Sequence, residues 1–88
     1  MGDRIHLATI SILIKDRQTH SGDVNDILSK HGKIIMARLG VNVQRSCVAY
    51  CTGMITVACE GRIKEIKALT KELNDLYGIV AKVNIMTD

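Results

Sequence analysis

The stretch Ile5–Ile14, which reads IHLATISILI, decides the fold because it predicts a strand with apolar residues on both faces. One face is wholly apolar and consists of Ala8, Ile10, Ile12 and Ile14. The other face is mixed and consists of Leu7, Thr9, Ser11 and Leu13. Each face of this strand therefore needs a covering layer.

Two amphipathic helices are expected further along the chain, each ending close to a glycine. The polar run Lys15–Gly22 predicts a loop, in which Thr19 or Ser21 caps the first helix. That helix has Gly32 as its left-handed stop and a buried stripe of Val24, Ile27, Leu28 and His31. The second helix has Gly78 as its terminator and a longer stripe of Ile63, Ile66, Leu69, Thr70, Leu73, Leu76 and Tyr77.

Three further strands are expected, at Lys33–Val43, about Gly53–Glu60 and Ile79–Met86. The first of these is predicted to carry Ile35, Ala37, Leu39, Val41 and Val43 on one side, and Ile34, Met36 and Arg38 on the other. The order is βαββαβ, in a single domain of residues 1–88. Right-handed crossovers place both helices on one face of a four-stranded antiparallel sheet, which is a ferredoxin-like arrangement.

This arrangement predicts self-association. It puts Ile5–Ile14 in the middle of the sheet and leaves the strand face that carries Leu7 and Leu13 without a covering helix. A homodimer or a higher oligomer, such as a tetramer, is the simplest cover for these groups. It would also enlarge a core that has to be built without any Phe or Trp.

Composition and charge exclude several classes of function. The net charge of +3 is spread along the chain, and the absence of Phe removes the stacking platform of RNA-recognition domains, so direct nucleic-acid binding is not expected. The start MGDRIH lacks a signal-peptide pattern, and no apolar run approaches the ~18 residues that span a bilayer. We therefore expect a cytoplasmic protein without a membrane segment. No Ser-His-Asp or paired-carboxylate constellation is present, so catalysis is not expected either.

The three cysteines allow a second interpretation of the protein's function. Cys47 and Cys51 lie in the run CVAYC, and Cys59 follows. In a strand the first two would lie ~13 Å apart and could not share an ion, whereas in a helical turn they would lie ~6 Å apart and could. A strand with structural thiols is favoured, and a metal- or redox-responsive protein that uses Cys47, Cys51 and Cys59 is the alternative.

Three stretches of the chain resemble the small regulators assigned to iron-only hydrogenase systems. They are IHLATISILIKDRQ, VNDILSKHGKIIMARLGV and EIKALTKELNDLYGIVAKVNIM, and their most specific residues are Asp16, Arg17, Arg38 and Gly40. Those regulators resemble ACT domains and the C-terminal domain of the nickel-responsive repressor. The resemblance implies an ACT-like, self-associating subunit that binds or senses a small effector and has no chemistry of its own.

The resemblance also has departures. The long stretch NVQRSCVAYCTG stands where family members have a short turn, and the repressor's histidine-rich nickel site is missing, so nickel sensing is not carried over. No cofactor follows from the sequence. No DNA reader fits in this length, so a role in transcription would act through a partner protein. The candidate ligand-binding residues are Asp16, Arg17, Thr19, Gly22, Arg38, Gly40 and Asn42.

Overall fold

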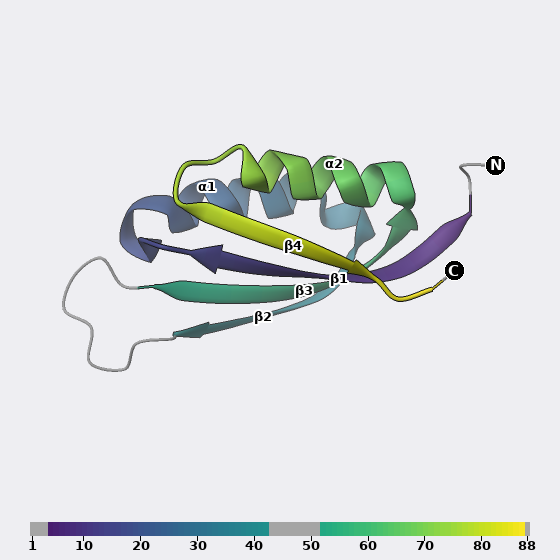
Figure 1. The fold of residues 1–88 in the computed structure, drawn as a ribbon, viewed down its shortest axis with the longest axis horizontal. Helices are drawn as coiled ribbons and strands as arrows, with labels where there is room; N and C mark the ends of the chain where they lie inside the picture. Colours follow the sequence, from purple (N-terminus) through teal and green to yellow (C-terminus); the bar gives the residue numbers. More distant parts are fainter. Residues whose placement is uncertain (1–3, 43–51, 88) are drawn as a thin grey trace.

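The computed structural model describes residues 4–42 and 52–87 and has the predicted order βαββαβ (Figure 1). Its elements are β1 (Ile5–Ile14), α1 (Arg17–Lys30), a 3-10 turn η1 (Gly32–Ile34), β2 (Ile35–Asn42), β3 (Gly53–Arg62), α2 (Ile63–Asn74) and β4 (Ile79–Ile85). The four strands of the described residues form one antiparallel sheet in the order β2-β3-β1-β4, with β1 in the interior as predicted.

The core lies between the sheet and the two helices. Figure 1 shows α1 and α2 on the same face of the sheet, with α2 running above β4. The predicted apolar face of β1 is confirmed, because none of its residues is more than 3% exposed; they are Ala8, Ile10, Ile12 and Ile14. The other fully buried side chains come from β3 and the helices and are Val57, Cys59, Val24, Ile66, Leu69 and Leu73. In the described part of the chain, no helix is long and apolar enough to cross a bilayer.

The first helix begins earlier than predicted. Asp16 is its N-cap, and its carboxylate accepts hydrogen bonds from the Thr19 backbone N–H at 3.4 Å and from the Thr19 hydroxyl at 2.8 Å. The predicted caps Thr19 and Ser21 therefore lie inside α1, and so does Gly22. A glycine inside a helix costs about 1 kcal/mol relative to alanine. Capping by Asp16 and the contacts of the helix with the sheet outweigh that cost.

Each predicted helix end matches the structure only in part: α1 ends just before Gly32, which is not left-handed, and α2 ends at Asn74, ahead of Gly78. Gly78 has φ +78° and is the only glycine with positive φ among the described residues, whereas Gly32 instead opens η1. Because α2 ends at Asn74, Tyr77 lies in the following turn and is 88% exposed, rather than being part of the buried stripe. A Cβ atom on Gly78 would come within 3.1 Å of the His20 ring, which itself lies edge-on to Tyr77.

An irregularity in β2 changes the predicted faces of that strand. The register with β3 shifts between Ile35 and Ala37, so one extra residue separates them. Ile35 lies opposite Cys59 on the helix-covered side, whereas Leu39 lies opposite Thr56 on the other side. The prediction that Ile35 shares a face with Leu39 is therefore wrong.

Candidate functional site

The sheet face opposite the helices, which we call the open face, carries exposed apolar side chains. Figure 1 shows both helices of residues 4–42 and 52–87 on the other side of the sheet. Leu7 is 41% exposed, Met54 is 39% exposed and Leu39 is 68% exposed. The centre of the face has short side chains, because the strand register brings together Thr9, Ser11, Thr56 and Ala58. The open face is therefore mixed: Leu13 lies opposite Met54 at one end, Leu7 lies opposite Glu60 toward the other, and the side chains between them on β1 and β3 are short.

A depression of about 280 Å³ lies in the open face where β1, β3 and β4 meet. It is lined by Ser11, Ile12, Leu13, Met54, Val80 and Lys82. Sites for drug-sized ligands usually have volumes of about 300–1,000 Å³ and enclose most of the ligand. This depression is better suited to apolar side chains from a facing surface than to a large cofactor.

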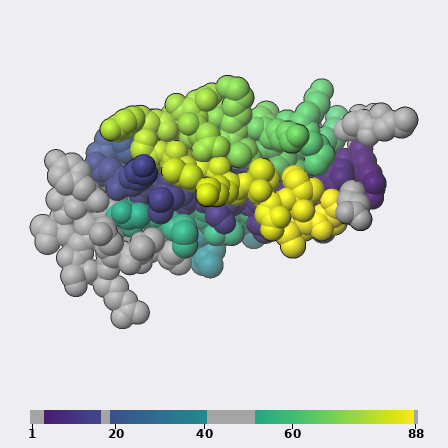
Figure 2. Space-filling model, in the orientation of Figure 1, coloured from purple at the N-terminus to yellow at the C-terminus, as the bar shows by residue number. Residues whose placement is uncertain are grey.

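One edge of the sheet is closed by a side chain from α2. The Asn74 side-chain amide donates to the Ala81 carbonyl at 2.9 Å, and its Oδ1 accepts from the Ala81 backbone N–H at 2.8 Å. Two residues earlier in β4, the Ile79 backbone N–H donates to the Leu76 carbonyl. These bonds occupy backbone groups that an added strand would need. The first half of β4 is therefore a poor edge for pairing with an added strand. Figure 2 shows α2 and β4 packed against each other along this flank.

Replacing Asn74 tests this closure. We expect Asn74→Ala to lower the free energy of unfolding by about 1–3 kcal/mol, because two hydrogen bonds to a partly buried backbone position are lost. Urea denaturation of the variant and of Asn84→Ala, an exposed asparagine on β4, measures the effect. Equal stability of the two variants would contradict the assigned role of Asn74.

The first group of predicted ligand residues lies at the start of α1. Asp16 and Thr19 bond to each other as the helix cap, so these groups already have partners within the chain. Arg17 is the first residue of α1, and its side chain lies outside the described part of the structure. Gly22 is exposed, and nothing lies within 4 Å of a Cβ atom built on it. A ligand at this site would bind to a helix surface rather than to the predicted loop.

The second group lies along β2. Arg38 points to the helix-covered side, where its Nη2 donates to Asn25 Oδ1 of α1 at 2.6 Å. Its partner is thus a side-chain amide, and the bond lies at an exposed position. Gly40 lies opposite Ile55, and Asn42 ends the strand opposite Gly53. Since Ile14 also lies opposite Gly53, the start of α1 and the end of β2 are at the same end of the sheet.

The hypothesis of a metal- or redox-responsive protein that uses its cysteines receives no support from the described residues. Cys59 is fully buried on the helix-covered side of β3, and burial raises the pKa of its thiol. A metal ligand needs the thiolate, which this environment disfavours. Cys47 and Cys51 lie outside the described residues. Within residues 4–42 and 52–87, no three His, Cys, Asp or Glu side chains come together as a metal site.

An ionic cluster between the two helices was not foreseen from the sequence. Glu72 of α2 accepts a hydrogen bond from Lys30 at 2.7 Å and also bonds His31 at the end of α1. The bonds from Lys30 and then from His31 lower the pKa of the Glu72 carboxyl. The sequence predicts His31 near the end of the first helix, which was a signal for an acidic partner. The identity of that partner depends on how α1 packs against α2.

This cluster predicts a pH-dependent contribution to stability. A carboxyl whose pKa is lowered by folding stabilises the protein above its ordinary value of 4.5 and loses that contribution as the pH falls through the lowered value. We expect Glu72→Gln to melt below the wild type at neutral pH, with a difference that shrinks toward zero as the pH falls through the lowered pKa of Glu72. Melting curves of the variant and of the wild type across this pH range check the prediction. A difference that stays constant with pH would contradict the ionic role.

The chain is similar to proteins of a known family. A family model described as "TM1266-like: Iron-only hydrogenase system regulator, putative" matches residues 6–83. The chain belongs to this family. Its description is that of a regulator, in agreement with the resemblance found in the sequence. None of the curated proteins matches the chain.

Solved structures confirm the ACT-like fold. The uncharacterized protein TM1266 from Thermotoga maritima matches with a TM-score of 0.84 at 20% identity, covering 96% of this chain and 100% of its own. The ACT domain of a GTP pyrophosphokinase from Chlorobium tepidum matches with a TM-score of 0.73 at 13% identity, covering 92% and 100%. CPII is a nitrogen regulatory PII-like protein from Thiomonas intermedia K12, and its structure is bound to ADP, AMP and bicarbonate. It matches with a TM-score of 0.59 at 12% identity, covering 97% of this chain and 96% of its own. At these identities the likeness is one of fold.

Proposed function

We propose that the protein is a non-catalytic, homo-oligomeric regulatory domain of an iron-only hydrogenase system, and that it senses a small effector. The observation that carries this proposal is the open face, where Leu7, Leu39 and Met54 are exposed, whereas the helix-facing side chains of β1 from Ala8 to Ile14 are buried. A second copy of the chain is the proposed cover. The domain acts in the cytoplasm through its effector and a partner protein, without binding nucleic acid directly.

The dimensions of the open face support a second copy as its occupant. At about 3.3 Å per residue and about 4.8 Å between strands, four strands of seven to ten residues present roughly 500 Å². Two such faces together bury roughly 1,000 Å², which is about the lower limit for a specific protein interface. Leu7, Leu39 and Met54 supply the apolar burial, and the short side chains of the middle of β1 and β3 permit close approach.

The effector is proposed to bind where the start of α1 and the end of β2 meet. The candidate residues remain Asp16, Arg17, Thr19, Gly22, Arg38, Gly40 and Asn42. Support comes from their shared end of the sheet and from the PII-like protein of the same fold, whose structure holds nucleotides and bicarbonate. Assembly of two copies would bring further residues to this end, so effector binding and association are expected to be coupled.

Ligand-induced stabilisation tests the effector part of the proposal. The melting temperature of the full chain would be measured with panels of amino acids, nucleotides and divalent metals. A ligand at 100 times its dissociation constant stabilises the native state by about 2.7 kcal/mol, which produces a rise of several degrees. We expect at least one compound to raise the melting temperature and to lose its effect in Arg38→Gln. No rise across the panels would indicate a purely structural assembly domain and would contradict effector binding.

The same preparation separates the proposal from cysteine chemistry. Metal analysis of anaerobically purified protein is expected to find no stoichiometric metal. Stoichiometric iron, zinc or nickel that is lost in Cys47→Ser would instead assign the protein to the metal-responsive class.

A further inference from the structure

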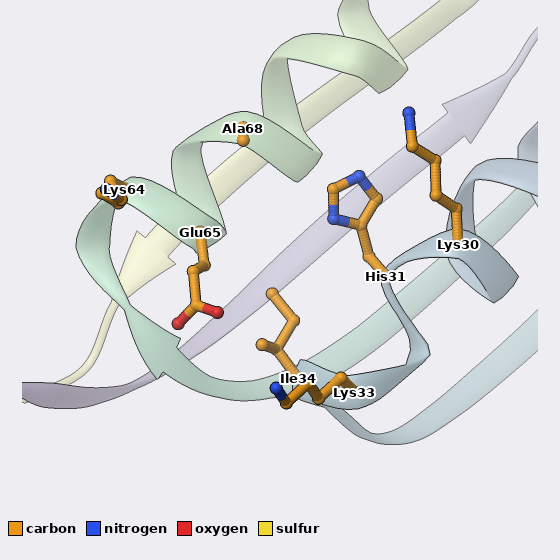
Figure 3. Close-up of a pocket in the computed structure, with 7 residues that line it drawn as sticks. All are labelled: Lys30, His31, Lys33, Ile34, Lys64, Glu65 and Ala68. Atoms are coloured by element: carbon orange, nitrogen blue, oxygen red, sulfur yellow. The ribbon is translucent and has the colours of Figure 1, made fainter.

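We infer that a cleft at the opposite end of the molecule binds a small organic anion with an apolar body. The cleft lies between the end of α1, the turn η1 and the first two turns of α2 (Figure 3). It is separate from the open face and from the proposed effector residues. It was not foreseen from the sequence, because its lining residues come from two segments about 30 positions apart.

The shape of the cleft suits a small ligand. Its volume is about 320 Å³, at the lower end of the range for small-molecule sites. Figure 3 shows His31, Ile34 and Glu65 pointing into the space between the two helices, with Ala68 on the facing side of α2. Ile34 and Ala68 supply an apolar floor for the body of the ligand.

The charges around the cleft favour an anion. Lys30, Lys33 and Lys64 all line it, and the only carboxylate in the lining belongs to Glu65. One oxygen of that carboxylate accepts the Arg62 backbone N–H at 2.9 Å as part of the α2 cap. The lysine groups thus outnumber the acidic group that faces them.

Two of the three lysines are available to a ligand. Lys30 is paired with Glu72 at 2.7 Å, which also bonds His31, so its charge is already balanced. Lys33 and Lys64 have no ion-pair partner among the described residues. These two ammonium groups, one from η1 and one from α2, can bind a phosphate or carboxylate group, while the body of the ligand contacts Ile34. Phosphate monoesters and aliphatic or aromatic carboxylates share this chemistry.

A titration followed by NMR tests this site with phenyl phosphate as the probe. Amide shifts are expected at Lys33, Ile34, Lys64 and Ala68, with an affinity in the millimolar range that weakens as salt is added. Lys33→Gln and Lys64→Gln are expected to weaken binding at least about fivefold each. Lys67→Gln is the matched control, since Lys67 is an exposed lysine on α2 that does not line the cleft.

Three outcomes would overturn the inference. They are no shifts at about 10 mM probe, equal weakening in the Lys67→Gln control, and inorganic phosphate binding as tightly as phenyl phosphate, which would remove the role of the apolar floor. Carboxylates are tested with benzoate, which is expected to shift the same amides. These results do not depend on the oligomeric mass or on the effector panels, so failure here leaves the proposed function standing, and the reverse also holds.

Discussion

Leu7→Lys should convert the assembled protein into a monomer at micromolar concentration. Leu7 lies on the open face of the central strand and directly opposite Glu60 of β3. Within one subunit the new ammonium group gains an opposite charge across the strands, so the subunit itself is expected to fold. In the assembly the same group would be buried against a second sheet, at a cost of several kcal/mol. We expect the dissociation constant to rise at least about 100-fold.

Light scattering of the variant measures this change, and Tyr77→Lys is its control. Tyr77 is an exposed apolar residue in the turn between α2 and β4, away from the open face. The control makes the same kind of substitution and should retain the wild-type mass. An unchanged mass in Leu7→Lys, or equal dissociation in both variants, would contradict assembly through the open face.

The second large effect is expected in the core. Leu69 of α2 is fully buried in a core whose buried side chains are aliphatic apart from the thiol of Cys59. Truncation by Leu69→Ala removes three carbon atoms and leaves a cavity, so the free energy of unfolding should fall by about 2–5 kcal/mol. In a domain of this size such a loss is a large part of the total stability.

Urea denaturation at a fixed protein concentration measures that loss. Lys67→Ala, at an exposed position on the same helix, should change stability by no more than about 0.5 kcal/mol. A loss below 1 kcal/mol in Leu69→Ala would show that α2 does not form the core cover described above.

The sequence allowed the sheet and α2 to be predicted because their patterns are long and regular. In Ile5–Ile14 a period of two persists over ten residues, which defines both the strand and its buried face. Gly78 marks the turn between α2 and β4, at a position with positive φ. These are local signals, so no knowledge of the rest of the molecule was needed.

The predictions were wrong where several residues can serve as the same local signal, or where contacts with a distant segment determine the local structure. Asp16, Thr19 and Ser21 can all cap a helix, so the local sequence did not decide where α1 begins. The faces of β2 depend on an extra residue between Ile35 and Ala37, which only the pairing with β3 reveals.

The sites have the same limitation. The hydrogen bond between Arg38 and Asn25 could not be predicted, because the direction of the Arg38 side chain follows the pairing of β2 with β3. The cleft that contains Lys33 and Lys64 forms only when η1 meets α2.

The mass of the wild-type chain in solution tests the central claim most directly. Sedimentation equilibrium at about 10 μM should give a multiple of the 9.7 kDa subunit, which is about 19 kDa for a dimer. A single species of 9.7 kDa at this concentration would mean that the open face stays in contact with water, and it would contradict the account.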